Sequence, residues 1–179
     1  AHRMHKAGFL PSLTLDLDAA RARAAQALLH ATKDGSLRNG PKDDTYDASL
    51  AQAAILGFPN RDVCETTMQS IARALAVQAG GKETGFYFRY LRTDDFGRPQ
   101  SSFVICSFWV VQGLARLGRM AEAQQIMAQV LTGANHLGLF SEHFVPETRT
   151  QLGNFPQAYS HVGLINAAFA VSPSWTTVL

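Results

Sequence analysis

The sequence predicts an all-α fold, an α/α toroid in which an outer ring of helices wraps an inner ring. Six helical segments follow from hydrophobic spacing and from start and stop signals at their ends. Amphipathic segments alternate with segments that are apolar on nearly every side, and long connections alternate with very short ones. The six segments span residues 16–33, 46–56, 61–77, 102–117, 120–136 and 157–171.

Each segment carries ordinary helix signals at its ends. Asp16 or Asp18 can cap the first segment, Asn60 the third and Ser102 the fourth, because their side-chain oxygens can accept a backbone N–H of the first turn. Glycine or proline, which end helices, follow the six segments in turn at Gly35, Gly57, Gly80, Gly118, Gly138 and Pro173.

The polarity of the segments separates inner helices from outer ones. The first, third and fifth segments carry charged or amide side chains at helical spacing, whereas residues 103–111 of the fourth contain no charged residue. A helix that is apolar on every side is buried on every side. The second, fourth and sixth segments are therefore predicted inside, with Phe108 and Trp109 turned away from solvent.

Three long connections, at 34–45, 79–101 and 137–156, each precede an inner segment. Such loops are usually functional, and this alternation places all three at the same end of the stack. Alternating residues at 84–90 and a turn at 94–97 predict a β-hairpin within the second. Residues 1–179 are interpreted as one domain, irregular over 1–15 and ending in a tail over 172–179.

Composition excludes several classes of protein. Net charge is +2 and no long basic run appears, which argues against nucleic acid as a partner. No apolar run reaches the roughly 18 residues of a membrane span, and no secretory signal is seen, so a cytoplasmic location is expected. Cys64 and Cys106 lie in apolar helical patterns and are predicted to be buried and reduced. The six histidines form no metal constellation, and no cofactor is expected.

Two neighbouring stretches carry the strongest functional signal. The first, Gly138-Leu139-Phe140-Ser141-Glu142, places one carboxylate in a glycine-flanked loop; the second, residues 152–161, is aromatic-rich and leads into the last helix. A carboxylate held in a loop at the mouth of a helical scaffold suits the base of a sugar hydrolase. The plainer interpretation is a solvated loop glutamate, which is the commoner fate of this residue type.

Together these stretches resemble the C-terminal part of family 15 glycoside hydrolases, the group of glucoamylases and bacterial or archaeal trehalases. The resemblance spans roughly residues 43–170. It implies a complete toroid of six inner and six outer helices, (α/α)6, of which this chain would supply half. It also implies inverting hydrolysis of an α-glucosidic bond in an α-glucoside or oligosaccharide, with Glu142 as general base.

The resemblance points to further sugar-binding residues. The segment around Arg89 and Tyr90 resembles a family loop whose arginine binds sugar hydroxyls, and a guanidinium offers paired donors in a fixed fork. Phe155, Tyr159 and His161 lie at the mouth of the last helix, where aromatic rings could stack on sugar or simply pack. Asp43 or Asp44 is interpreted as a capping residue rather than a catalytic one.

The general acid is the missing element. In the family it is a glutamate that usually follows tryptophan, but neither Trp109 nor Trp175 precedes an acid here. The chain is therefore expected to be inactive alone and to need the N-terminal half of the toroid, or self-association. The alternative is a non-catalytic helical scaffold or a carbohydrate-binding regulatory module, for which Glu142 and Arg89 would have no reason to lie together.

Overall fold

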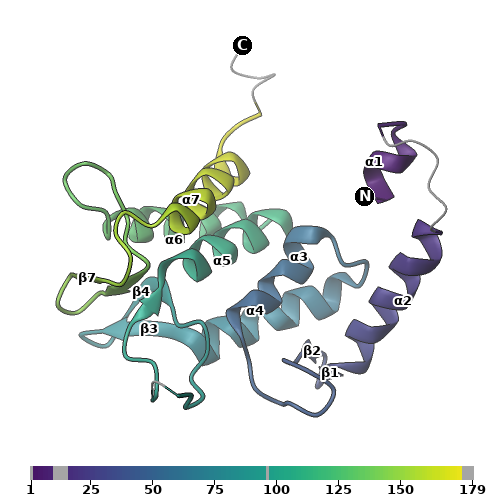
Figure 1. Ribbon diagram of the computed structural model, residues 1–179, viewed down its shortest axis with the longest axis horizontal. Helices are drawn as coiled ribbons and strands as arrows, with labels where there is room; N and C mark the ends of the chain where they lie inside the picture. Colours follow the sequence, from purple (N-terminus) through teal and green to yellow (C-terminus); the bar gives the residue numbers. More distant parts are fainter. Residues whose placement is uncertain (1, 10–15, 96, 175–179) are drawn as a thin grey trace.

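The computed structural model describes residues 2–9, 16–95 and 97–174. Helices dominate this part of the chain, and short strands stand in the connections between them (Figure 1). The helices are α1 His2–Lys6, α2 Leu17–His30, the 3-10 helix η1 Ala48–Ala51, α3 Gln52–Leu56, α4 Arg61–Leu75, α5 Val104–Arg116, α6 Met120–Leu131 and α7 Ala158–Val171.

The strands form three small antiparallel sheets, so the all-α prediction is wrong in this respect. The long connections, which were predicted mostly as loops, fold back on themselves as hairpins. The first sheet pairs β1 (Thr32–Lys33) with β2 (Ser36–Leu37), the second pairs β3 (Ala76–Ala79) with β4 (Lys82–Tyr87), and the third is ordered β5 (Ser102–Phe103), β6 (His143–Val145), β7 (Thr150–Leu152).

Helix starts follow the sequence signals where these are local. Asp16 accepts the backbone N–H of Ala19 at 2.9 Å, and Asn60 accepts that of Val63 at 3.1 Å, which confirms both as N-caps. The third predicted helix ends at Leu75 because Gly80 and Gly81, both with positive φ, form the turn of a β3–β4 hairpin instead of a helix end.

Ser102 is not a helix cap. It lies in β5, where its buried hydroxyl donates to the carbonyl of Phe144 at 2.6 Å. Helix α5 starts two residues later without a side-chain cap, and its first N–H, that of Val104, donates to the carbonyl of Glu142 at 3.0 Å.

The chain ends differ in part from expectation. Residues 2–6 form α1 where an irregular start was predicted, whereas residues 10–15 and 175–179 lie outside the described residues. The fifth helix stops at Leu131 rather than at 136. No helix in the described part of the chain combines the length and the apolar character needed to cross a bilayer.

Helix α5 forms the centre of the core. It packs against α3, α4, α6 and α7, and its Phe108 is fully buried with 0 % exposure. Trp109 is partly buried and packs against the same core. Cys106 of α5 and Cys64 of α4 are both buried free thiols, as predicted. Burial of the fourth predicted helix on nearly every side is therefore confirmed.

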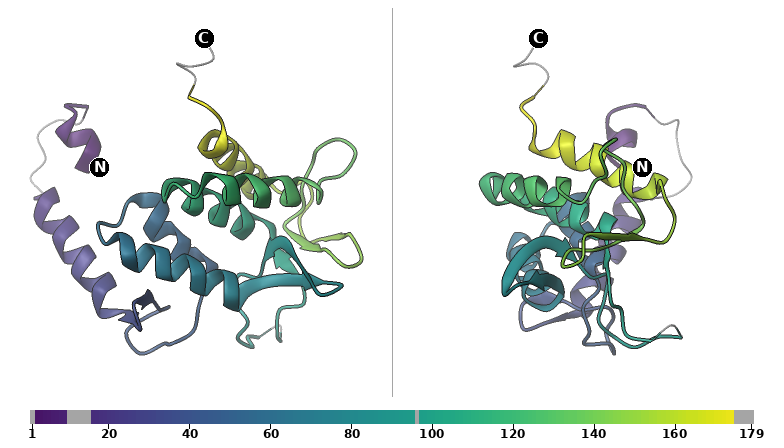
Figure 2. Two further views of the ribbon diagram at one scale, coloured as in Figure 1. Left: turned by 180° about the vertical axis from the view of Figure 1, so that it is seen from behind. Right: turned by 90° about the vertical axis from the view of Figure 1, so that its left-hand side faces the viewer.

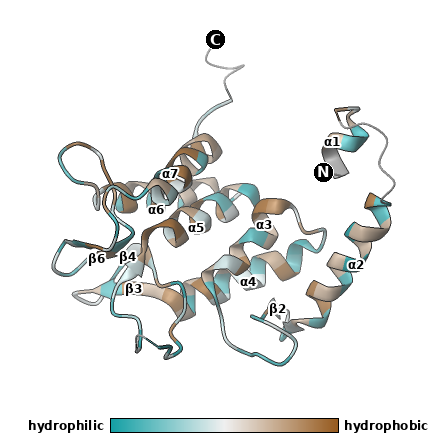
Figure 3. Ribbon diagram, viewed as in Figure 1, coloured by the Kyte–Doolittle hydropathy of each residue, from teal (hydrophilic) through white to brown (hydrophobic). Residues whose placement is uncertain are grey.

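Helices α7 and α3, both predicted inside, are more exposed than predicted. In α3 only Ala54 is buried. Only Ser160, Gly163 and Ala167 are buried in α7, although hydrophobic residues recur along it (Figure 3). Its apolar sequence therefore does not make it buried on every side within the described part of the chain. Helix α2 has no buried residue and extends away from the α4–α7 body together with α1 (Figure 2).

Candidate active site

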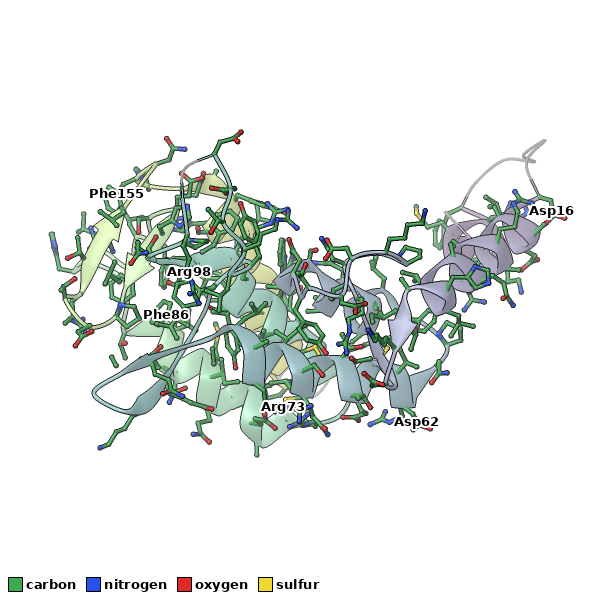
Figure 4. The ribbon with its side chains drawn as sticks, turned by 90° about the horizontal axis from the view of Figure 1, so that it is seen from below. Asp16, Asp62, Arg73, Phe86, Arg98 and Phe155 are labelled. Carbon is green, nitrogen blue, oxygen red and sulfur yellow. The ribbon has the colours of Figure 1, made fainter. Side chains whose placement is uncertain are left out.

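One cleft of about 520 Å³ brings the second and third long connections together. Both Arg89 and Glu142 line it, so the two residues singled out from the sequence lie at the same end of the molecule. Arg98, which also lines it, lies toward the same end as Phe155, whereas Asp16 lies at the far end (Figure 4). The described lining residues are Arg89, Tyr90, Asp94, Gly97, Arg98, Pro99, Gln100, Ser101, Phe103, Glu142 and His143.

The backbone of the Glu142 segment is anchored from three directions. Its carbonyl accepts the first N–H of α5, from Val104, at 3.0 Å, and its N–H donates to the carbonyl of Asn154 at 2.9 Å. The carbonyl of the preceding Ser141 accepts the hydroxyl of Ser160, in the first turn of α7, at 2.8 Å. The first turns of α5 and α7, together with Asn154, therefore fix the position of Glu142.

The carboxylate of Glu142 is held through one oxygen. Its Oε2 accepts the backbone N–H of Asn154 at 3.1 Å and the side-chain amide of the same residue at 3.0 Å. Its Oε1 makes no hydrogen bond with the described residues, and the side chain is partly exposed. One oxygen is therefore free to meet water or a ligand in the cleft.

Arg89 is pinned to the start of η1. Its Nε contacts Oδ2 of Asp47 at 3.3 Å, and its carbonyl accepts the N–H of Ala48 at 2.7 Å. The Asp47 side chain is only 6 % exposed, and its Oδ1 also caps η1 by accepting the N–H of Ser49 at 2.8 Å. Because Asp47 engages Nε alone, the two Nη groups of a half-exposed guanidinium stay available at the cleft.

Tyr90 forms a hydrogen bond with Asp94, in the turn that follows it. Its hydroxyl donates to Oδ2 of Asp94 at 2.5 Å, and this hydrogen bond to a carboxylate raises the pKa of the Tyr90 phenol. The guanidinium of Arg92 lies 4.6 Å from the Tyr90 ring centroid and 3.8 Å from Asp43. Two of the long connections therefore meet here, at one end, as the alternation of loops predicted.

Asp43 does not cap a helix. It closes a turn by accepting the hydroxyl of Thr45 at 2.6 Å and its N–H at 2.9 Å, and Asn39 donates to its other oxygen. These hydrogen bonds, led by the Thr45 hydroxyl, lower the pKa of Asp43 to about 2. The capping role expected of Asp43 or Asp44 belongs to Asp47.

His143 is a cleft residue that the sequence analysis left out of the site. Its Nδ1 lies 3.1 Å from the carbonyl of Ser102 and 3.2 Å from the hydroxyl of Ser101, and its ring stacks on Phe103 with centroids 5.0 Å apart. A carbonyl only accepts, so Nδ1 carries the proton. The one available signal was its position directly after Glu142.

Three predicted sugar-binding residues do not line this cleft. Both ring nitrogens of His161 bond to backbone: Nδ1 donates to the carbonyl of Gln157 at 2.8 Å, and Nε2 accepts the N–H of Phe140 at 3.4 Å. Tyr159 meets Trp109 edge-on with ring centroids 6.1 Å apart, and both Tyr159 and Phe155 are about half exposed. The structure places these three around the start of α7, outside the described lining of the cleft, although Phe155 directly follows Asn154, which contacts Glu142.

Two other residues of the site were missed for different reasons. Asp47 precedes Ala-Ser-Leu, a pattern typical of an N-cap, but its pairing with Arg89 spans 42 positions and leaves no local signal. Asn154 belongs to the quoted motif, yet nothing in the motif indicates that it contacts Glu142. Across residues 2–9, 16–95 and 97–174, no three histidine, cysteine or acidic side chains gather as metal ligands would.

Comparison with known proteins places this arrangement in a family. Residues 118–169 match the model of glycosyl hydrolases family 15. The chain is 37% identical over 142 residues to a trehalase of Mycolicibacterium smegmatis, covering 78% of this chain and 21% of that protein. It is 38% identical over 125 residues to a trehalase of Thermoplasma acidophilum, covering 68% and 20%. The chain thus spans about a fifth of the length of these curated relatives.

Solved structures agree at the level of the fold. A wild-type glycosidase superposes with a TM-score of 0.68 at 21% identity, over 87% of this chain and 43% of that chain. A glycosidase carrying the substitution E335A, in complex with glucose, gives the same TM-score at 20% identity. The family model, the trehalase relatives and the shared fold agree, and the chain belongs to glycosyl hydrolase family 15.

Proposed function

We propose that this chain carries the general-base part of an inverting α-glucoside hydrolase, with Glu142 as the base and Arg89 as a sugar ligand. The observation that carries the proposal is the shared cleft, which has a carboxylate with one open oxygen on one connection and a fixed guanidinium on another. Similarity to trehalases supports an α-glucosidic substrate such as trehalose or a maltooligosaccharide.

In this reaction Oε1 of Glu142 takes a proton from a water molecule. The water oxygen bonds to the anomeric carbon as the glycosidic C–O bond breaks, and a general acid on the opposite side protonates the leaving oxygen. An inverting pair needs its carboxyl groups roughly 6.5–9.5 Å apart to admit that water. Arg89 would bind hydroxyls of the sugar through its Nη groups and hold the anomeric carbon in place.

The general acid is proposed to lie outside these 179 residues. Among the described residues of the cleft, the carboxylates are those of Glu142 and Asp94. Asp94 is already engaged as the acceptor of the Tyr90 hydroxyl at 2.5 Å, so we do not propose it as the acid. In this proposal the described residues of the cleft supply the base and a sugar ligand, and the proton donor comes from elsewhere.

The exposed apolar faces support a partner for this chain. Val162, Ile165 and Phe169 of α7 are 50%, 54% and 58% exposed, and Leu56 at the end of α3 is 74% exposed. Val162, Ile165 and Phe169 recur at helical spacing on α7, and large exposed apolar patches mark interaction sites. We propose that the helices form half of an (α/α)6 toroid, closed by the N-terminal half of the ring or by self-association.

The central experiment compares these 179 residues with the longest natural chain that contains them. Hydrolysis of trehalose and of maltotriose is measured by glucose release. The 179-residue chain is expected to be inactive and the longer chain active. Glu142→Gln in the longer chain keeps the shape of the side chain but cannot take the proton, so turnover should fall by about 10²–10⁴-fold. If Glu142→Gln leaves turnover unchanged, the general base is another carboxylate.

A second candidate function is a carbohydrate-binding module without catalysis, which is favoured because, besides Glu142, the one carboxylate among the described cleft residues is that of Asp94, which already accepts the Tyr90 hydroxyl. It predicts that the longer chain binds trehalose or maltotriose, seen by calorimetry, without turning either over. Arg89→Ala would then abolish binding while Glu142→Gln left it intact.

A further inference from the structure

We infer that Asn154 is a positioning residue for Glu142, which it holds so that only Oε1 faces the reacting water. The inference rests on the proposed function, because it assigns a role in the reaction that Glu142 is proposed to catalyse. Its basis is the set of contacts between these two residues, which lie 12 positions apart in the chain.

Three hydrogen bonds join the two residues. The N–H of Glu142 donates to the carbonyl of Asn154 at 2.9 Å, which fixes the two backbones side by side. In return, the backbone N–H of Asn154 and its side-chain amide both donate to Oε2, at 3.1 and 3.0 Å. Two donors on one oxygen fix the side-chain rotamer and also the rotation of the carboxylate plane.

The residue before Asn154 makes this approach possible. Gly153 has φ +75°, a conformation that costs L residues with a side chain, and it sits directly against the Glu142 side chain. A Cβ at position 153 would lie 2.8 Å from Oε2 and 3.0 Å from Cβ of Glu142. Glycine at 153 therefore lets the main chain of Asn154 come within hydrogen-bond distance of the carboxylate.

The hydrogen bonds from Asn154 to Oε2 of Glu142, called the clamp below, give the two carboxylate oxygens different roles. With Oε2 occupied by two donors, proton transfer from water is directed to Oε1, which accepts no hydrogen bond from the described residues. A general base acts only when its oxygen is within hydrogen-bond reach of the proton, and a displacement of about 1 Å can lower the rate by 10²-fold. Asn154 thus acts on the chemical step through Glu142, without touching the sugar.

The test uses the longest natural chain containing these residues and measures kcat, KM and the kcat–pH profile on trehalose or maltotriose. Asn154→Ala removes the side-chain donor and keeps the backbone donor, so kcat should fall about 10–100-fold while KM changes less than about 2-fold. A residue with a purely structural role would lower the melting temperature and leave kcat per folded molecule unchanged.

Asn154→Asp provides a readout that depends on charge. It keeps the size of the side chain but places a second carboxylate beside Oε2, so the two groups share a proton up to a higher pH. The acidic limb of the kcat profile should therefore move to higher pH. The other ionisable groups in the described lining of the cleft, Arg89, Tyr90, Asp94, Arg98 and His143, are unchanged in this comparison.

Asn135 offers a matched control. Its Oδ1 accepts the N–H groups of Leu137 and Leu139, both at 2.9 Å, so it shapes the same connection without touching Glu142. Asn135→Ala should lower the melting temperature and leave the acidic limb in place. If Asn135→Ala moves the acidic limb of the kcat–pH profile as far as Asn154→Asp does, the inference that Asn154 positions Glu142 is wrong.

The outcomes separate this inference from the proposed function. If Glu142→Gln abolishes turnover while Asn154→Ala and Asn154→Asp leave kcat and its pH profile unchanged, the clamp is wrong and the base assignment stands. If Glu142→Gln itself leaves turnover unchanged, the proposed function fails. Loss of kcat with an unchanged KM in Asn154→Ala, together with the shifted limb in Asn154→Asp, supports the clamp.

Discussion

Helices α5 and α7 have almost equally apolar sequences but very different surroundings. Nine of the 13 residues of α5 are buried, against three of the 14 residues of α7. Both contact each other, and α5 also lies between α3, α4 and α6. An apolar sequence therefore indicates the environment that a helix requires, and the described part of this chain supplies that environment to α5 and only partly to α7.

The largest expected difference between the two helices lies in their phenylalanines. Phe108 of α5 is fully buried, so Phe108→Ala should lower the free energy of unfolding by about 3–5 kcal/mol. Phe169 of α7 is 58% exposed, and Phe169→Ala should change it by no more than about 0.5 kcal/mol. Urea unfolding at low protein concentration measures both. Equal losses would show that α7 is buried in solution.

Charges on the exposed face of α7 should abolish the contact surface that we propose for it. Ile165→Glu combined with Phe169→Lys places a favourable i, i+4 ion pair on the helix, so α7 itself stays stable. Any self-association through this face should weaken by at least about 10²-fold, equivalent to about 2.7 kcal/mol. Sedimentation velocity over a concentration series measures the change.

The control for this variant is the same pair on α6. Ala121→Glu with Gln125→Lys changes two exposed positions outside the apolar face and should leave association unchanged. If the parent chain sediments as a monomer at all concentrations, self-association is ruled out. The N-terminal half of the ring is then the remaining partner proposed for the exposed face of α7.

The sequence predicted those features that depend on neighbouring residues. The caps Asp16 and Asn60 and the apolar character of α5 are local and were found. Ser102 was misassigned because the carbonyl that takes its hydroxyl belongs to Phe144, 42 positions away. The strands β6 and β7 have three residues each, too short for alternation to reveal them, and depend on pairing with each other and with β5.

The candidate site was foreseen to a similar extent. The alternation of long and short connections predicted that Arg89 and Glu142 would lie at one end, and both line the cleft. The supporting contacts from Asp47 and Asn154 could not be foreseen, because side-chain distances across 42 and 12 positions follow from the folded backbone. His161 was predicted to bind sugar, but both of its ring nitrogens bond to backbone. An aromatic-rich turn in the sequence does not reveal such contacts.

Two glycines test how closely α5 is packed on each side. A Cβ at Gly163 of α7 would lie 3.1–3.2 Å from Ile105 and Phe108, including Cβ of Phe108, which is fixed to the backbone. Gly163→Ala should therefore destabilise by about 1–2 kcal/mol, after a gain of about 1 kcal/mol from helix propensity. A Cβ at Gly113 of α5 would meet the flexible end of Met68 at 3.0 Å, which can move aside.

Gly113→Ala should consequently be neutral or stabilising by up to about 1 kcal/mol. Thermal unfolding followed by circular dichroism compares the two variants with the parent. The opposite order, with Gly113→Ala the more harmful, would mean that α7 is loosely held and that the tight contact of α5 lies with α4.

The smallest effect concerns the aromatic contact at the start of α7. Tyr159 meets Trp109 of α5 edge-on at 6.1 Å, and such pairs contribute about 0.5–1.5 kcal/mol. Tyr159→Ala should lower the free energy of unfolding by about that amount, and Tyr159→Phe, which keeps the ring, by less. Because Tyr159 lies apart from the Arg89–Glu142 cleft, both variants should keep the KM of an active longer chain. A raised KM for Tyr159→Ala at unchanged stability would instead show that the ring stacks on sugar, and that the open face of α7 is part of the binding surface.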